Sequence, residues 1–453
     1  MHLEGVATRA TRQRRAGGPA VLSRRDFLVR CAGAGLGVYP VADPPGRAPA
    51  KASTAAPQRV SDDTVDETFP WGRLRDLLHT RFRDLRRHFV FEYYPWYAND
   101  PFFHWQQWDR NPPDDLAANT VPRLGAYDSR STAVLEQHAR WIAESGAGVI
   151  DMSWWGRESF TDRAVHRVMD VMAAHDIHVM FHLEPYGLER VERFPADVLY
   201  LLEEFGERRR WDCWYFNERD AGRQTPVFKT FNTLLPERIR DCHGRLQNVP
   251  EYVPDAEWRR ATDRLRATLA SEFPDLVLLA DSVDAQRVRN AGFDGVAPYG
   301  PLAARSTWLG TALAASRLGL ACAFNVNPGL DEIERRTVPP DSCYTPRPFL
   351  PPTRPFDWSE PRERERAAGL AERQIDATLQ WALLLQTDPW LAPGLDFFLL
   401  FICSFNEWHE GHQFEPMKDA GELTAAEREH AYHNPHDGAY RLRRLTDALG
   451  RLV

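Results

Sequence analysis

From residue 88 to the end of the chain, short apolar runs alternate with longer stretches of helical periodicity. The runs are continuous rather than alternately polar and apolar, which is typical of strands buried on both faces of a parallel sheet. Strands are predicted at residues 88–95, 148–154, 178–184, 226–231, 276–281, 295–299, 321–326 and 396–405. Helices are predicted between several of them, over 133–144, 162–175, 255–272 and 285–291.

Eight strand–helix alternations over about 360 residues favour an α/β protein built as a single (β/α)8 TIM barrel. A doubly wound sheet is the alternative, but no G-x-G-x-x-G follows the first predicted strand, which weakens a dinucleotide site. The barrel is expected over residues 86–453, after a linker with a lead-in helix over residues 51–85. The Pro-rich stretch from Pro339 to Pro361 is expected to be a long excursion after the seventh strand.

Residues 1–50 have the features of an export signal. Ser23–Leu28 reads SRRDFL, and an apolar run from Cys31 to Val41 and the small residues Ala48-Pro49-Ala50 follow it. This pattern resembles a bacterial twin-arginine (Tat) signal, which is read by a receptor and does not anchor the protein. The apolar run is too short to span a bilayer, and no later stretch reaches 18 uninterrupted apolar residues. We therefore expect export by the Tat machinery to the periplasm or medium, without membrane attachment after signal removal.

Composition narrows the class of function. The 453 residues are 43% hydrophobic, enough for a large core, so an intrinsically disordered chain is excluded. Acidic residues outnumber basic ones by 64 to 56 and no basic stripe stands out, so no nucleic-acid partner is expected. The chain has 15 Trp, 13 Tyr and 24 Phe, side chains that can stack against sugar rings.

In a barrel of this kind the active site lies where the strands end and the following loops begin. Aromatic, acidic, amide and imidazole side chains recur at these predicted strand ends. They are Glu92, Tyr93, Tyr94, Trp96, Tyr97, Trp154, Trp155, His182, Glu184, Tyr186, Tyr299, Asn325, Asn327, Asn406, Glu407, Trp408, His409 and Glu410. One such residue is usually structural, but their repetition at one rim predicts a site.

The densest group is the string SFNEWHEG over residues 404–411, after the last predicted strand. Glycoside hydrolysis needs two carboxyl groups, one to protonate the leaving oxygen and one to act as base or nucleophile, and Glu407 and Glu410 supply such a pair. Repulsion between them in a poorly solvated, aromatic environment would raise one pKa. The alternatives are a solvated surface loop and a metal site, but His409 and His412 are spaced i, i+3 rather than the i, i+4 of H-E-x-x-H. No metal is expected.

Six ordered strings resemble glycoside hydrolase family 99, the endo-α-1,2-mannosidases and endo-α-1,2-mannanases. They are YYPWY (93–97), NPPDDL (111–116), LGAYDSR (124–130), FHLEPY (181–186), AGFDG (291–295) and SFNEWHEG (404–411). The resemblance implies a (β/α)8 barrel, no cofactor, and retaining endo-cleavage of an α-mannoside next to an α-1,2 linkage through a 1,2-anhydro sugar. By motif position, Glu407 would take the proton from the mannose 2-hydroxyl, and Glu410 would act first as acid and then as base.

The resemblance also implies where the substrate binds. Tyr94, His182, Glu184 and Tyr299 align with family positions around the cleaved mannose, and Trp155 with a position that holds the neighbouring sugar, where Trp goes with mannose. The remaining candidate substrate-binding residues are Trp96, Trp154, Tyr186, Asn406, Trp408 and His409. The expected partner is an α-mannan or another α-linked oligosaccharide. Departures from the family pattern at Ala98, at Ala297 and in the long excursion 339–361 leave open a glycosidase for another α-glycan. A carbohydrate-binding homologue without turnover is a further alternative, disfavoured by the presence of both glutamates, and a polysaccharide-biosynthesis protein is another, disfavoured by the export signal.

Overall fold

The computed structural model describes residues 69–185, 189–217, 224–241, 243–300, 305–338, 349, 354–393 and 395–453. These residues belong to one compact unit, Asp63–Val453. The expected export signal, most of the expected linker, Tyr186 and most of the Pro-rich stretch lie outside the described residues.

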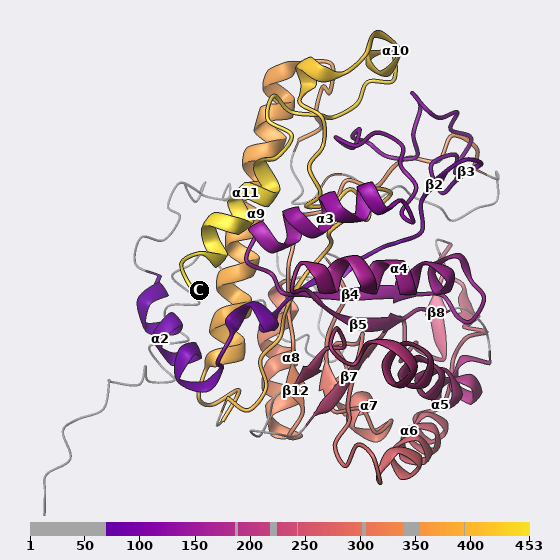
Figure 1. Cartoon of the computed structure of the whole chain (residues 1–453), viewed down its shortest axis with the longest axis vertical. Helices are drawn as coiled ribbons and strands as arrows, with labels where there is room; N and C mark the ends of the chain where they lie inside the picture. Colours follow the sequence, from indigo (N-terminus) through magenta and orange to yellow (C-terminus); the bar gives the residue numbers. More distant parts are fainter. Residues whose placement is uncertain are drawn as a thin grey trace, which may run out of the picture. The chain divides into compact units, whose positions relative to one another are not determined.

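The described residues form a closed barrel of parallel strands. They are β1 (Phe89–Tyr93), β4 (Val149–Trp154), β5 (His178–Leu183), β7 (Thr225–Thr230), β10 (Val277–Ala280), β11 (Gly295–Val296), β12 (Ala321–Cys322), β13 (Asn325–Val326) and β14 (Leu400–Ile402). The pairing order is β12-β11-β10-β7-β5-β4-β1-β14-β13. Because β12 and β13 are two parts of one run, the ends of this order meet, and the predicted (β/α)8 barrel is confirmed (Figure 1).

Helices surround these strands (Figure 1). They are α3 (Thr132–Glu144), α4 (Phe160–Ala174), α5 (Arg190–Leu201), α6 (Asp255–Leu269), α7 (Ala285–Asn290), α8 (Arg305–Arg317), α9 (Pro361–Thr387), the short α10 (Ala425–Arg428) and α11 (Tyr440–Leu449), with the π-helical segment η2 (Leu202–Arg210) after α5 and the 3-10 turn η3 (Ala420–Glu422) before α10. The four predicted helices correspond to α3, α4, α6 and α7. The 27-residue helix α9 begins with Pro361, whose fixed φ suits the first turn of a helix.

The predicted strands are all found, but most are shorter than their apolar runs, as three examples show. The run 321–326 is interrupted between β12 and β13, only Gly295–Val296 of 295–299 is regular, and only Leu400–Ile402 of 396–405 pairs as a strand. Beyond β14 the chain turns into a loop, where the Phe405 amide still donates to the Glu92 carbonyl (2.7 Å). Apolar runs therefore locate strands more reliably than they set strand ends.

The expected lead-in helix is α2 (Trp71–Arg81), followed by the 3-10 turn η1 (Leu85–His88). It packs against the barrel through Leu74 and Leu78, and the His79 ring lies 2.9 Å from the Leu452 carbonyl near the C-terminus. Three short antiparallel segments complete the described strands: hairpin β2 (Ala98–Asn99) with β3 (Phe102–Phe103), hairpin β8 (Arg238–Arg240) with β9 (Leu246–Asn248), and β6 (Phe216–Asn217) beside β7.

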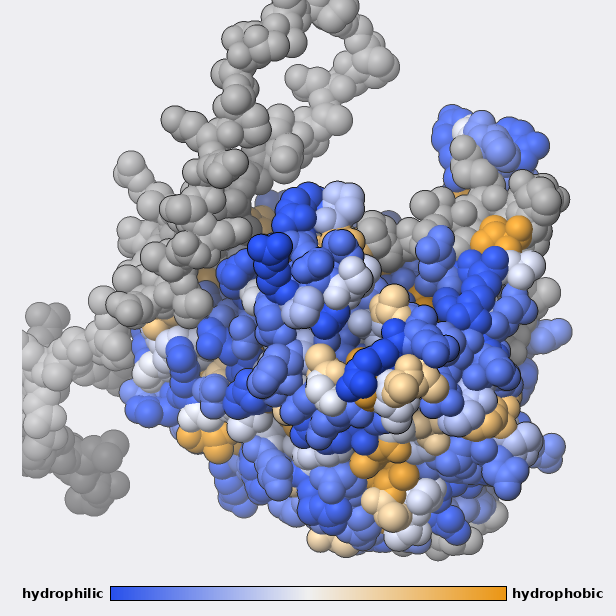
Figure 2. Space-filling model, turned by 90° about the horizontal axis from the view of Figure 1, so that it is seen from above, coloured by the Kyte–Doolittle hydropathy of each residue, from blue (hydrophilic) through white to orange (hydrophobic). Residues whose placement is uncertain are grey.

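No helix in the described part of the chain is long and apolar enough to cross a membrane. The face drawn in Figure 2 is mostly hydrophilic, with scattered hydrophobic patches.

Candidate active site

Inward-facing side chains change from apolar to ionisable along four of the barrel strands. Side chains of a strand alternate between its two faces, so residues two apart share the barrel interior. Four strands run from an apolar residue near their start to a polar one near their end: Val90 to Glu92, Val149 to Asp151, Met180 to His182, and Val227 to Lys229. An apolar layer therefore lies beneath a layer of ionisable groups, at the end of the barrel where active sites form.

This charged layer has its own internal cation. The Lys229 ammonium group donates to Glu92 Oε1 and lies 4.0 Å from Asp151 Oδ2, and all three side chains are buried. Burial alone would lower the pKa of Lys229, but the two carboxylates outweigh burial and raise it. Burial, and to a lesser degree the charge of Glu92, raise the pKa of Asp151 to about 8 against the opposing effect of Lys229.

Ligand atoms of Glu92, Asp151 and His182 lie within 4.8 Å of one another, a spacing that could hold a metal ion. Lys229 already neutralises Glu92 there, and a divalent cation would have to displace its ammonium group. The donor set is therefore better suited to an ion pair than to a metal.

The two glutamates that the sequence singled out lie on the loop after β14. The base of this loop is closed by backbone bonds between Ser404 and His412 (3.1 Å) and between Phe414 and Ser404 (2.8 Å). Within it, Ser404 Oγ accepts from the Glu407 amide at 2.9 Å. Gly411 has a φ of +68°, and a Cβ at this position would collide with the Asp331 backbone, so the turn between Glu410 and His412 requires glycine.

The two carboxyl groups have different environments. The Glu407 side chain is 4% exposed and the Glu410 side chain 28% exposed. Burial, then the charges of Glu410 and Glu184, raise the pKa of Glu407 well above its usual range, against the hydrogen bond from the His409 amide (3.0 Å). Burial also raises the pKa of Glu184 to about 8, although Ser153 donates to it at 2.7 Å. Neighbouring carboxyl groups that cannot all ionise are the arrangement that acid–base chemistry requires.

Two groups contact the Glu410 carboxyl group, and a third supports one of them. Tyr299 OH donates to Glu410 Oε2 at 3.2 Å, and Tyr94 OH donates to Tyr299 OH at 2.9 Å. His412 Nε2 lies 2.8 Å from the same Glu410 oxygen. Tyr94, Tyr299 and Glu410 come from different strand ends, and the structure brings them together as the sequence predicted.

Aromatic rings form a wall beside the glutamates. The centroid of the Trp96 ring lies 4.8 Å from that of Tyr94, 6.1 Å from that of Trp155 and 6.3 Å from that of His409. Trp155 is 39% exposed, which is unusual for a tryptophan at a strand end. Its indole Nε1 donates to Ser153 Oγ (3.1 Å), which in turn donates to Glu184. Exposed rings next to carboxyl groups suit the apolar faces and hydroxyls of a sugar.

His182 also lies at this end of the barrel, buried in the interior. Its ring centroid is 6.2 Å from that of Tyr299, and its Nδ1 is 3.7 Å from Asp151 Oδ2. Burial, then the charge of Lys229, lowers its pKa well below the usual value, so the imidazole is neutral. It lies between the charged layer and the cluster of Tyr94, Tyr299 and Glu410.

Three predicted binding residues have other positions. Trp154 follows the inward-facing Ser153, so it points out of the barrel, where its Nε1 donates to Asp162 (2.8 Å). Trp408 is fully buried and donates to Glu415 Oε2 (2.9 Å). Asn406 is buried and bonds both the amide (2.7 Å) and the carbonyl (2.9 Å) of Tyr94. The structure therefore does not place Trp154, Trp408 or Asn406 among the side chains exposed at the barrel end, and their direct contact with substrate stays a prediction.

Four residues of this region were not predicted from the sequence: Asp151, Lys229, Ser404 and His412. Lys229 did carry a signal, since it is one of three lysines in the chain and stands inside an apolar strand. His412 was considered only as half of a metal motif. The glycine between Glu410 and His412 could have suggested a tight turn that brings these two side chains together.

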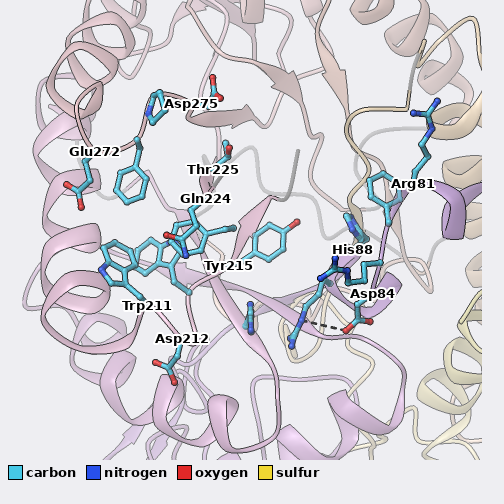
Figure 3. Close-up of a pocket in the computed structure, with 18 residues that line it drawn as sticks. Arg81, Asp84, His88, Trp211, Asp212, Tyr215, Gln224, Thr225, Glu272 and Asp275 are labelled. Atoms are coloured by element: carbon cyan, nitrogen blue, oxygen red, sulfur yellow. Dashed lines mark ion pairs between the residues drawn. The ribbon is translucent and has the colours of Figure 1, made fainter. Parts of the chain in front are cut away.

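A cavity of about 1060 Å³ opens at the other end of the barrel, where the strands begin. Figure 3 shows Tyr215 and Thr225 near its centre, with Arg81 and Glu272 on opposite sides. None of the predicted site residues lines it. The candidate site is therefore identified by its chemistry and not by the volume of this cavity.

Comparisons with known proteins agree with the chemistry of the barrel end. The family model of Glycosyl hydrolase family 99 matches residues 85–232. The glycoprotein endo-alpha-1,2-mannosidase-like protein of Danio rerio is 25% identical over 382 residues, which cover 76% of this chain and 74% of that protein. The glycoprotein endo-alpha-1,2-mannosidase of Mus musculus is 23% identical over 373 residues, 75% and 70% of the two chains.

Among solved structures, the GH99 endo-alpha-mannosidase of Bacteroides thetaiotaomicron in complex with BIS-TRIS-propane superposes with a TM-score of 0.58 at 19% identity. The match covers 81% of this chain and 97% of that chain, and it supports the barrel fold. The family model and the relatives show that this chain is similar to proteins of glycosyl hydrolase family 99, and the solved structure shows that it shares their fold.

Proposed function

We propose that the protein is a retaining, endo-acting α-mannosidase in which Glu407 and Glu410 perform the chemistry. The observation that carries this proposal is the pair itself: two carboxyl groups on one loop at the catalytic end of the barrel, one of them with a pKa raised by burial and by the other. The endo-α-1,2-mannosidase activity named for the relatives supports the substrate class.

In the proposed first step, Glu407 accepts the proton of the mannose 2-hydroxyl, whose oxygen attacks C1. The bond from C1 to the leaving oxygen breaks, and that oxygen takes the proton of Glu410. A 1,2-anhydro sugar results, with the proton now on Glu407 and Glu410 ionised.

In the second step, Glu410 accepts a proton from water, whose oxygen attacks C1. The bond from C1 to O2 breaks, and O2 takes back the proton from Glu407. Two inversions at C1 give net retention, and both glutamates regain their starting states.

The raised pKa of Glu407 fits this cycle if the pair is treated as one acid that holds a single proton. In the free protein, burial favours the proton on Glu407. A bound 2-hydroxyl donates to Glu407 and favours its ionised form, which moves the shared proton to Glu410. Substrate binding thus prepares both groups for the first step.

We further propose a mannan-type substrate, in which Trp155 contacts the sugar next to the cleaved mannose. The exposed ring of Trp155 and its link through Ser153 to Glu184, whose charge raises the pKa of Glu407, support this proposal. The test is incubation of purified protein with α-1,6-mannan that bears α-1,3/α-1,2 branches, followed by analysis of the released oligosaccharides.

A released disaccharide with retained anomeric configuration is the expected product, and a mannosyl-capped substrate should react faster than a glucosyl-capped one. Release of single sugars from chain ends, or inversion at C1, would contradict the proposal. Equal rates on the two capped substrates would show that Trp155 does not set a preference for mannose at the neighbouring position.

We also propose that the protein is exported through the Tat pathway. Support comes from the SRRDFL string and the apolar run after it. Residues 1–50 fused to a reporter should direct it out of the cytoplasm of a Tat-containing bacterium. The double change Arg24→Lys/Arg25→Lys should abolish export, and a reporter still exported by that double variant would rule out this route.

A further inference from the structure

We propose that His412 is a positioning residue that fixes the proton of Glu410 on one carboxyl oxygen. This inference rests on the proposed function and adds to it a residue outside the glutamate pair. His412 is fully buried, whereas the Glu410 side chain is 28% exposed. A buried imidazole therefore lies behind a carboxyl group that reaches solvent.

The hydrogen bonds determine which nitrogen of His412 carries the proton. Ser404 Oγ accepts from the Glu407 amide (2.9 Å) and lies 3.0 Å from His412 Nδ1, so the Ser404 hydroxyl can donate to this nitrogen. With Nδ1 as acceptor, neutral His412 carries its hydrogen on Nε2. That hydrogen is donated to Glu410 Oε2 at 2.8 Å.

A second donor meets the same oxygen. Tyr94 donates to Tyr299, and Tyr299 donates to Glu410 Oε2 (3.2 Å). Two donors at Oε2 disfavour a proton there, because that proton would point at their own hydrogens. When Glu410 acts as an acid, its proton is therefore carried by Oε1.

This arrangement affects the first step more than binding. As Glu410 gives up its proton, negative charge develops on the carboxylate, and the hydrogen bonds to Oε2 become stronger. His412 thus stabilises the transition state in which the leaving oxygen is protonated. The other ionisable groups near the imidazole are Tyr299 and the Cys403 thiol, whose Sγ lies 3.8 Å from Nδ1.

The position of His412 is set by the backbone. Its carbonyl accepts from the Ser404 amide (3.1 Å), and Gly411 supplies the left-handed turn that brings residue 412 back beneath Glu410. The backbone therefore directs a side chain at position 412 toward Ser404 and Glu410. Glutamine can place an N–H near the position of imidazole Nε2, while leucine offers no donor.

The experiment compares two leaving groups. Wild type, His412→Gln and His412→Leu are assayed for kcat/KM on a mannan oligosaccharide and on the corresponding glycosyl fluoride, which departs with little need of a proton. kcat/KM reports the steps up to loss of the leaving group, so the later attack of water does not enter. His412→Leu should lose about 10- to 100-fold on the oligosaccharide and less than about 3-fold on the fluoride. His412→Gln should recover most of the loss.

The control is His88→Leu, which removes another buried histidine, at the start of β1, where Nδ1 lies 2.7 Å from the Phe398 carbonyl. It should lower the unfolding midpoint without changing the ratio of the two rates. An equal loss on both substrates for His412→Leu, or no loss, would overturn the inference.

If His412→Leu does not fold, His412→Asn replaces it, since the shorter amide cannot reach Glu410 while it bonds Ser404. Equal rate ratios for the Asn and Gln variants would then overturn the inference. A wild-type protein inactive on both substrates would instead refute the proposed function.

Discussion

Replacement of Glu410 by glutamine is expected to lower kcat/KM on natural mannan linkages by at least about 10³-fold, because glutamine cannot protonate the leaving oxygen. Glutamine keeps the size of the side chain, and its amide can still meet the donors from Tyr299 and His412 on its carbonyl oxygen. The fold and the affinity for sugar should therefore remain. The measurements are steady-state rates, the thermal unfolding midpoint, and titration with a mannose oligosaccharide.

The matched variant is Glu407→Gln, and the two should differ on a glycosyl fluoride. Without Glu410 the fluoride can still leave, so Glu410→Gln should retain much of its kcat/KM on this substrate. Without Glu407 the 2-hydroxyl has no base, so Glu407→Gln should lose activity on both substrates. Near wild-type turnover of mannan by Glu410→Gln would remove it from the mechanism, and the reverse pattern would exchange the two roles.

Lys229→Met is expected to destabilise the protein by about 3–5 kcal/mol, because it leaves a buried carboxylate without its counter-charge. Glu92 and Lys229 are both buried at about zero exposure, and Asp151 lies close enough to sense the same loss. The free energy of unfolding measured with urea at pH 7 tests this value.

A companion variant defines the cause. Glu92→Gln/Lys229→Met removes both charges and should recover most of the lost stability. A loss below about 1 kcal/mol for Lys229→Met at pH 7, or no recovery in the double variant, would show that the pair contributes little.

The sequence predicted the barrel well because its signal is repeated. Eight apolar runs each had to be buried on two faces, and an error at one of them would not change the architecture. The glutamate pair was found for a similar reason, since Glu407 and Glu410 stand three residues apart after the last run. The ends of the strands were harder to predict. In β11 and β14 the backbone pairing stops inside the apolar run, so hydrophobicity alone does not mark where the strand ends.

The orientation of individual side chains was harder to predict. Trp154 and Trp155 are adjacent and chemically alike, yet strand alternation sends one outward to Asp162 and leaves the other exposed near Trp96. Trp408 lies on a loop, where no periodicity applies, and its burial depends on packing from distant segments. His412 depends on the turn at Gly411, a contact with Asp331 that the sequence does not reveal.

The burial of Lys229 also limits chemical coupling of this protein through its primary amines. The chain has three lysines: Lys229 is enclosed in the barrel, Lys418 pairs with Glu427 at 2.7 Å, and Lys51 precedes the described residues. Reagents that couple to primary amines would therefore find few targets on the barrel and none among the described groups that surround the glutamate pair. Tethering through amines to a resin or dye would therefore leave the described side chains around the glutamate pair unmodified.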